Sequence, residues 1–456
     1  MERVGASNTP EGGGLWARRH RPVVAGLFGM MTFIAFETFA VTTALPVVAR
    51  DLAAEQWYSL AFAATVTTGL VGMTVGGRWA DLRGPGRPLA VGGLLFLAGI
   101  GLCAAAPDMA VFVLGRLLQG VGGGIDSVVL YVVIARTLPE SLRPRVFGLL
   151  SAAWLLPSIA GPLVTGALVE VMHWRAVFAL VLVGSAGSLA VLMSAVRTLP
   201  AENGRKLPLD RRGMWAVASA AAVLGLHVAG QQEMPWLALW TAAGSVAVVA
   251  AAARLLPRGT LLARPGIPRV VAFRGVAGAV CTATDIYLPL YLQHQLGHGP
   301  VVAGAAVAVG SFGWALGSWI QARSKAPAGD PAGLRWAAAL VVCGPAGCVL
   351  LVSGAAPLAA AVAGCVLMGV GMGILYPQLS TLILALSPAR EQGGNSSALQ
   401  VSESLGTSLL VAVTGAVLTA SVPSGYPAVY GVAAAVGLAG LALALAPAPR
   451  GAVSPS

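Results

Sequence analysis

Four carboxylate side chains lie well inside long apolar stretches of this 456-residue chain: Glu37, Asp126, Asp285 and Glu403. A charge at the centre of a bilayer costs about 2.5–3.5 kcal/mol on insertion scales, so such groups normally face a wet cavity. A carboxyl group in such a cavity can take up and release protons. We therefore interpret the four as candidate proton-coupling residues. The alternative is a permanent structural pair with a buried arginine or a hydroxyl group.

Arg116 is the one arginine well inside the first half of the chain, and glycines follow it from Gly120 to Gly124. Asp126 lies ten residues further along the same expected helix, about 15 Å away, which is too far for a direct pair. We expect Arg116 to hold a carboxylate of another helix until substrate or a proton arrives. A structural bond to a backbone carbonyl group is the alternative.

A polar stripe is predicted near the end of the chain, where Ser396, Gln400, Glu403 and Thr407 are spaced four, three and four residues apart. This spacing places them on one face of a helix. Such a stripe indicates either an aqueous path or a hydrogen-bonded seam between helices.

The elements that position these residues are membrane-spanning helices. The chain is 57% hydrophobic and 10% charged, whereas a soluble domain has about 25% charged residues. Apolar runs near 20 residues, the length needed to cross the bilayer core, repeat along the chain. The expected segments are 23–48, 56–79, 88–106, 109–136, 146–170, 174–196, 213–230, 235–256, 268–295, 300–322, 334–353, 356–386, 394–421 and 426–446.

The predicted fold class is an all-α polytopic membrane protein with two six-helix bundles and an inserted two-helix hairpin. The expected parts are a tail (1–22), a first bundle (23–197), a linker (198–212), the hairpin (213–256), a second linker (257–267), a second bundle (268–446) and a tail (447–456). Twelve spans with two interfacial segments are the alternative, because His227, Gln231 and Gln232 interrupt the hairpin.

The net charge of +11 has a topological explanation. The expected spans leave 24 of the 28 Lys and Arg residues in the tails or in loops on one side. By the positive-inside rule both termini are then cytoplasmic, with a bacterial cytoplasmic membrane as the expected location. Contact with anionic membrane lipids explains this charge better than nucleic-acid binding does. The five cysteines lie in apolar segments without metal-type spacing, so no metal or other cofactor is expected.

A short basic turn, Gly77 to Arg87, connects the second and third segments, and a weaker echo of it runs from Gly317 to Arg323. Its distinctive residues are Gly77, Asp81, Arg83, Gly84 and Arg87. A carboxylate such as that of Asp81 can dock on the positive N-terminus of another helix. Residues 394–396, which open the thirteenth segment, are a suitable partner, and the contact would latch the two bundles together. A plain basic turn that only sets topology is the alternative.

Pro157, Gly161, Pro162 and Gly166 occupy the fifth segment. Proline removes a backbone hydrogen bond and kinks a helix, and glycine permits close approach. We count them, with the basic turn, as a candidate conformational gate.

Together these motifs resemble the major facilitator superfamily, specifically its fourteen-helix branch of drug:proton antiporters. The basic turn matches the family's loop motif, although Pro85 and Gly86 shift the last arginine. Arg116, Gln119, Gly120 and Gly122 match the fourth-helix motif implicated in proton transfer, and Gly161, Pro162 and Gly166 match the antiporter motif. Glu37 stands where this branch usually has Asp. Thr42 stands where Asn is common, which puts substrate contacts there in doubt. The candidate substrate-cavity residues are Thr42, Gln119, Tyr287, Gln400 and Thr407.

The resemblance implies proton-driven export of drugs or small amphiphilic metabolites by alternating access, with small molecules, protons and membrane lipids as partners. No phosphate-binding loop of the Walker type is present, so the proton gradient is the expected driving force. A transporter or flippase of lipids or glycolipids with the same fold is the alternative. An intramembrane enzyme is disfavoured because no metal-ligand spacing or nucleophile elbow is present. A non-transporting sensor is disfavoured because no large regulatory domain is present.

Overall fold

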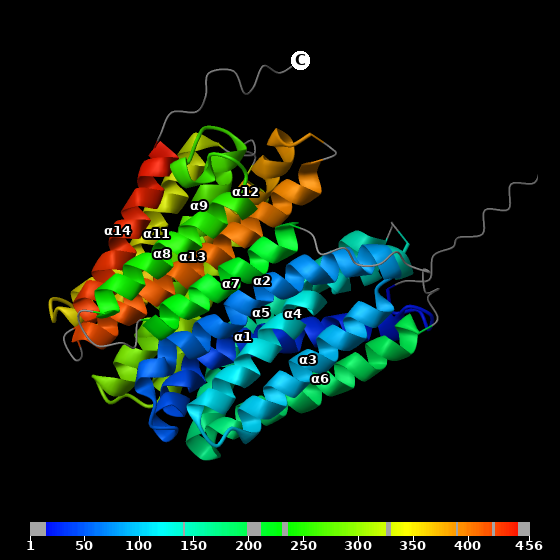
Figure 1. Cartoon of the computed structure of the whole chain (residues 1–456), viewed down its shortest axis with the longest axis horizontal. Helices are drawn as coiled ribbons and strands as arrows, with labels where there is room; N and C mark the ends of the chain where they lie inside the picture. Colours follow the sequence, from blue (N-terminus) through cyan, green and yellow to red (C-terminus); the bar gives the residue numbers. More distant parts are fainter. Residues whose placement is uncertain are drawn as a thin grey trace, which may run out of the picture.

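The structure is a computed structural model that describes residues 15–139, 142–197, 211–229, 236–324, 330–388, 391–421 and 425–445. Its described part is helical, and Figure 1 shows two bundles that are inclined to each other. The first bundle contains α1 (Arg21–Asp51), α2 (Tyr58–Arg83), α3 (Gly86–Ala105), α4 (Met109–Thr137), α5 (Arg143–Val171) and α6 (Trp174–Val196). The second contains α9 (Ile267–His294), α10 (Pro300–Arg323), α11 (Pro331–Val352), α12 (Leu358–Leu386), α13 (Gln392–Ser421) and α14 (Tyr426–Leu445).

Two helices lie between the bundles in sequence, α7 (Arg211–Ala229) and α8 (Trp236–Leu255). The other twelve are long and apolar enough to cross a membrane, whereas α7 and α8 have shorter apolar stretches, Gly213–His227 and Ala242–Leu255. The expected fold class, two six-helix bundles with an inserted hairpin, is confirmed.

Local signals explain where several helices begin. The Asp108 carboxylate accepts a hydrogen bond from the Val111 backbone N–H at 2.9 Å, and Asp330 accepts one from Gly333 at 2.8 Å. Both bonds satisfy N–H groups that have no partner inside the helix. Proline occupies the first turn of α1, α5, α9, α10 and α11, where its missing N–H costs nothing.

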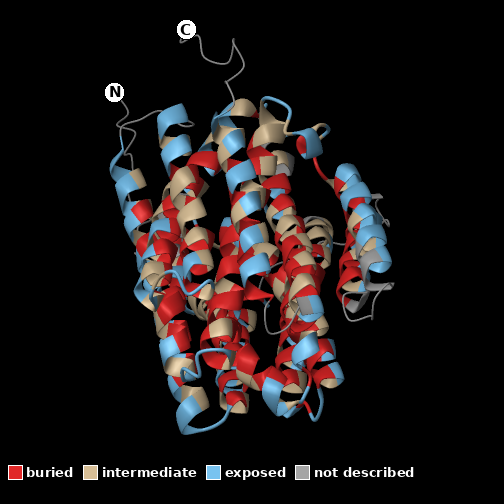
Figure 2. Cartoon of the chain, turned by 90° about the vertical axis from the view of Figure 1, so that its left-hand side faces the viewer, coloured by how far each residue is buried: buried red, intermediate tan, exposed pale blue. Residues whose placement is uncertain are grey.

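The start of α1 and the end of α14 lie on one side of the molecule, the termini side, at the top of Figure 2. The opposite end is called the far side below. Buried residues concentrate between the helices, whereas exposed apolar side chains such as Leu94, Val183 and Leu438 cover the outside. This distribution suits a helical protein surrounded by lipid.

The described contacts between the bundles lie at the middle of the helices or toward the far side. Tyr58 of α2 donates a hydrogen bond to the Ile286 carbonyl oxygen of α9 at 2.7 Å, and Gln293 donates one to the Thr43 carbonyl oxygen at 3.2 Å. Nearest the middle, the Thr67 hydroxyl of α2 lies 3.1 Å from the Ser408 hydroxyl of α13. This conformation is therefore closed on the far side.

The hairpin packs on α2 of the first bundle and on α13 of the second. Its own apolar core joins Val223 and Leu226 of α7 and Val248 of α8 to Ala412 of α13. The hairpin thus bridges the two bundles along one of their two seams. The other seam is formed by α5 and α10.

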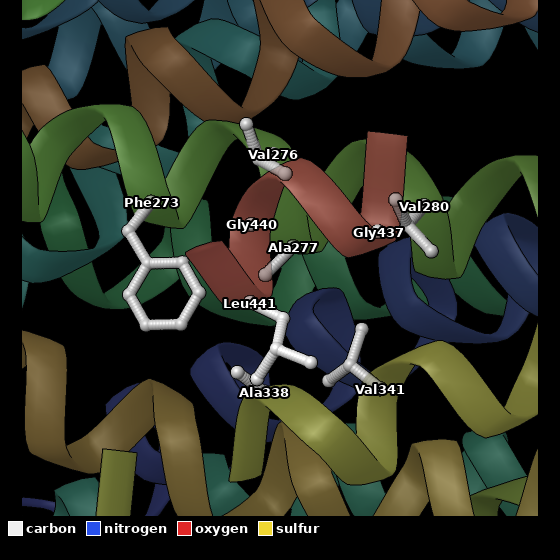
Figure 3. Close-up of a pocket in the computed structure, with 9 residues that line it drawn as sticks. All are labelled: Phe273, Val276, Ala277, Val280, Ala338, Val341, Gly437, Gly440 and Leu441. Carbon is white, nitrogen blue, oxygen red and sulfur yellow. The ribbon is translucent and has the colours of Figure 1, made fainter. Parts of the chain in front are cut away.

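A small apolar hollow lies between α9, α11 and α14 of the second bundle (Figure 3). Phe273, Val280 and Val341 line it, and Gly437 and Gly440 of α14 form its floor. None of its lining residues is polar or charged, so it offers no group for proton or substrate chemistry.

Candidate functional site

The first bundle holds a buried ion pair between α1 and α4. An Nη1 hydrogen of Arg116 is donated to Glu37, and both residues are only 3% exposed. Arg116 also donates to Gln119 Oε1 at 2.8 Å and, through Nε, to the Ala61 carbonyl oxygen of α2 at 3.2 Å. The Arg116 guanidinium is thus held by three helices, away from solvent.

Glycines in α4 allow the helix to approach its neighbours closely enough for this arrangement. A side chain at Gly120 or Gly124 would overlap α2, and one at Gly122 would overlap the backbone of α3 at Phe96. This close packing brings the Arg116 side chain within reach of α1 and of the Ala61 carbonyl group. The glycine-rich run therefore positions the arginine rather than binding a ligand itself.

The second bundle holds a different charged cluster, here called the Arg274 cluster: Arg274 of α9, Trp314 of α10, Tyr376 of α12 and Glu403 of α13. Arg274 donates through Nε to Glu403 Oε2 at 2.8 Å, and Tyr376 donates its hydroxyl hydrogen to Glu403 Oε1 at 2.7 Å. The Arg274 guanidinium carbon lies 3.3 Å from the centre of the Tyr376 ring, and Trp314 meets that ring edge-on at 4.9 Å. The two charged side chains are 13% and 30% exposed, respectively.

Gly278 makes room for this cluster. A Cβ atom there would lie 2.7 Å from Glu403 Cγ and 3.0 Å from the Tyr376 hydroxyl oxygen. Any larger residue would push Glu403 away from Arg274. The α9 and α13 backbones also meet closely at Gly275 and Gly406, which fixes the level at which the two charges face each other.

Asp126 is separate from both charged groups. It is fully buried, and neither carboxylate oxygen has a hydrogen-bond partner among the described residues. Its Oδ1 atom fills the space that a side chain at Gly92 of α3 would occupy. The structure therefore places Asp126 inside the first bundle between α3 and α4, and not beside Glu37.

Asp285 is half-buried on α9, where Cys281 Sγ lies 3.6 Å from its Oδ2 atom. Tyr287, two residues further along α9, lies beside the closed contact, with its ring centre 6.3 Å from that of Tyr58 of α2. Tyr287 is fully buried, donates to the Val411 carbonyl oxygen at 3.1 Å and accepts from the Thr414 hydroxyl at the same distance. The Thr42 hydroxyl is also buried and donates to the Phe39 carbonyl oxygen at 2.7 Å. The four predicted carboxylates thus do not meet in one place in this conformation.

The polar stripe of α13 changes character along its length. Gln400 is exposed, Glu403 is partly exposed in the Arg274 cluster, and Thr407 is buried with a hydroxyl group that has no described partner. Ser408, the next residue, forms the hydrogen bond to α2. The stripe therefore runs from an open surface on the termini side into the seam between the bundles.

The basic turn after α2 depends on Gly84, whose φ of +77° lies in the region that favours glycine. Arg83 is partly exposed and Arg87 exposed, while a Cβ atom at Gly77 would lie 3.1 Å from Val128 Cγ1 of α4. The Asp81 side chain lies outside the described residues, so the predicted latch stays a prediction. Asn395 donates to the Ser387 hydroxyl oxygen at 2.9 Å. In the weaker repeat of this turn, residues 317–323, Gln321 accepts a hydrogen bond from Gln378 of α12 at 2.8 Å.

The fifth-helix motif lies at the seam between α5 and α10. A Cβ atom at Gly166 would lie 2.7 Å from Val301 Cα, and one at Gly304 would lie 2.9 Å from the Pro162 carbonyl carbon. Gly161 faces α1 at Phe39, and Pro157 is buried inside α5. Beyond Gly166, Glu170 Oε1 accepts a hydrogen bond from the Val301 backbone N–H at 3.0 Å. These residues lie where α5 and α10 pack closely, and their role as a conformational gate stays a prediction.

Sequence reasoning missed Arg274, Tyr376, Trp314 and Glu170 as members of a site. A signal for Arg274 was present, because Arg274, Gly278, Cys281 and Asp285 repeat the four-three-four spacing of the α13 stripe. Two matching stripes predict two helices that face each other through polar groups. Tyr376, Trp314 and Glu170 carry no such signal.

The described residues form arginine–carboxylate pairs, and no group of three metal-binding side chains occurs among them. Two helical bundles that meet at one end around buried charges define a secondary transporter. The chain belongs to the Major Facilitator Superfamily, whose sequence profile matches residues 27–411. This is a family of transporters and not of enzymes.

Several known proteins are similar to this chain. The MFS transporter L2 of Phoma sp. is 25% identical over 403 residues, which cover 84% of this chain and 67% of that protein. The probable multidrug-efflux transporter Rv1634 of Mycobacterium tuberculosis is 30% identical over 320 residues, 64% of each chain. The uncharacterized MFS-type transporter EfpA of the same organism is 31% identical, over 62% of this chain and 54% of that one. The match thus spans about half to two thirds of these relatives.

Solved structures show the same fold. An auto inhibited peptide transporter of the POT family superposes with a TM-score of 0.67 and 14% identity, over 92% of this chain and 96% of that one. The human organic anion transporter MFSD10 superposes with a TM-score of 0.62 and 14% identity, over 93% and 99% of the two chains. At this identity the likeness concerns the fold alone.

Proposed function

We propose that this protein is a proton-coupled antiporter of the fourteen-helix drug:proton branch, which exports drugs or small amphiphilic metabolites. The observation that carries the proposal is the dry ion pair of Glu37 and Arg116, held between α1 and α4. Relatives named as probable multidrug-efflux transporters support export as the direction of transport.

The ion pair suggests how a proton drives the cycle. A buried pair is stable only while both charges are present, because an unpaired buried charge is costly. A proton that binds Glu37 removes one charge and releases Arg116, which favours a different packing of α1 against α4. Loss of that proton on the other side of the membrane restores the pair. Asp126, Asp285 and Glu403 are the further proton sites of this proposal.

The arrangement of basic residues supports an orientation with both termini in the cytoplasm of a bacterial cell. Described arginines on the termini side include Arg18, Arg19, Arg21, Arg83, Arg87, Arg264 and Arg269, whereas Arg50 and Arg175 lie at far-side helix ends. Under the positive-inside rule the far side is then outside, and this conformation faces the cytoplasm. Labelling of single introduced cysteines with an impermeant maleimide tests this orientation at residues 19 and 175.

The decisive experiment measures export from cells that lack their own exporters, with a panel of amphiphilic compounds and an uncoupler. We expect uncoupler-sensitive export by the wild type and none by Glu37→Gln. Asp108→Asn is the matched control, because it also removes one carboxylate but keeps an exposed helix cap. Export that persists with the uncoupler would refute proton coupling. Movement of lipids alone would favour a lipid transporter of the same fold.

A further inference from the structure

The Arg274 guanidinium is only partly used by the protein. Its Nε donates to Glu403, and its flat face lies over the Tyr376 ring. The two terminal nitrogens make no hydrogen bond among the described residues, although a guanidinium carries five N–H donors in a fixed fork. By contrast, Arg116 uses both Nε and Nη1 and is sealed from solvent.

The cluster lies next to the route between the bundles. Arg274, Trp314 and Glu403 belong to α9, α10 and α13, which are the second-bundle helices that contact α1, α5 and α2. Glu403 is five residues before Ser408, so it lies about 7.5 Å from that hydrogen bond, toward the termini side. Glu403 is 30% exposed there, whereas Ser408 is buried in the seam. A solute that enters from the termini side therefore meets the cluster before the closed contact.

The available donors favour an anionic ligand over a cationic one. Both Glu403 oxygens already accept hydrogen bonds, from Arg274 and from Tyr376, and the Arg274 charge offsets that of the carboxylate, so an incoming cation would have to compete with both partners. The unused arms of the Arg274 fork match the geometry of a carboxylate or a phosphate group. The Trp314 and Tyr376 rings next to the fork provide an apolar surface for the rest of an amphiphile.

We propose that Arg274, oriented by Glu403 and Tyr376, binds the acidic head group of an amphiphilic substrate. This rests on the proposed function, in that the cluster must lie on the transport path, but it concerns the class of substrate and not the driving force. Glu403 and Tyr376 act as positioning residues, and Trp314 packs against the apolar part of the ligand.

The test is equilibrium binding to the full-length protein in detergent, with no proton gradient. The probes are 11-(dansylamino)undecanoic acid, its methyl ester, the amine of equal chain length and an alkyl phosphate with the same dansyl chain. We expect the wild type to bind the acid or the phosphate about tenfold or more tightly than the ester, and the amine no better than the ester. Preference for the phosphate over the carboxylate would identify a lipid-type head group, and the reverse a free acid.

Arg274→Gln should remove the difference between acid and ester while the ester still binds, which shows that the variant is folded. Arg274→Lys should keep part of the preference, because it retains the charge without the fork. Arg323→Gln is the control, since Arg323 also stacks on a tryptophan of α10, at 3.9 Å from the ring centre, but has no carboxylate partner among the described residues. An unchanged preference in Arg274→Gln, or a wild type that prefers the amine, would overturn the proposal. Export that persists with the uncoupler while head-group selectivity is intact would instead reject only the proton coupling.

Discussion

Each of the two bundles contains an arginine–carboxylate pair, but the pairs come from different helices and differ in burial and in their further partners. In the first bundle the carboxylate comes from α1 and the arginine from α4, whereas in the second the arginine comes from α9 and the carboxylate from α13. The first pair is 3% exposed and has a third partner in Gln119. The second is 13% and 30% exposed and leaves two nitrogens without a described partner.

This difference separates two tasks that a transporter must perform. A dry pair has two well-defined states, paired and broken, because an intermediate state leaves a buried charge without a partner. A partly exposed pair tolerates change, since water compensates for a lost contact. The first pair therefore suits a switch, and the second suits the binding of varied ligands.

Arg116→Met gives the largest expected effect on stability. It leaves Glu37 buried without its partner, which costs about 3–5 kcal/mol in the free energy of unfolding. The measurement is thermal unfolding of the purified full chain at pH 8. The double variant Glu37→Gln/Arg116→Met should recover most of the loss, because no unpaired charge remains. If the single variant is as stable as the double, the first pair does not depend on charge.

Gln119→Leu gives the second-largest expected loss in the free energy of unfolding. Gln119 Oε1 accepts a charge-assisted bond from Arg116 at 2.8 Å, and such bonds contribute about 1.5–3 kcal/mol. The loss should fall near the lower value, since the Gln119 Nε2 atom has no described partner and its removal relieves a buried donor. Gln378→Leu is the matched control, because Gln378 is also buried and forms a neutral bond to Gln321. If Gln378→Leu loses as much stability as Gln119→Leu, the charge of Arg116 does not strengthen its hydrogen bond to Gln119.

Arg274→Met tests the stability contribution of the second pair, that of Arg274 and Glu403. Glu403 keeps its bond from Tyr376 and has access to water, so the expected loss is about 1 kcal/mol. The same thermal assay therefore predicts a much smaller shift than for Arg116→Met. Equal losses for the two arginines would remove the proposed distinction between a switch and a binding site.

The sequence predicts the fold better than the site because the two depend on different information. Apolar runs and basic loops reflect the bilayer, which acts on each segment independently, so the two six-helix bundles and the shorter hairpin follow from local patterns. Glu37 and Arg116 were recognised separately for the same reason, as charges in apolar surroundings. Their pairing is a tertiary fact, because it depends on how far the α4 glycines let that helix approach its neighbours.

The surroundings of Asp126 could not be predicted from the sequence either. A carboxylate in an apolar helix predicts a wet cavity, but Gly92 of α3 creates just enough space for it inside the bundle. No periodicity in either helix indicates which glycine will face which carboxylate. The Asp81 latch stays a prediction for a different reason, since its side chain lies outside the described residues.

Tyr376→Phe gives the smallest expected effect on stability, and it tests directly whether water reaches the Arg274 cluster. It removes the 2.7 Å bond to Glu403 but keeps the ring that contacts Arg274 and Trp314. The expected loss is about 0.5 kcal/mol, because water can replace a hydroxyl group at a partly exposed carboxylate. Tyr287→Phe is the matched control and should lose more, about 1–1.5 kcal/mol, since its buried hydroxyl group bonds to both Val411 and Thr414 of α13. A reversed order would mean that the Arg274 cluster is as dry as the first pair, and a ligand could then not reach the arginine.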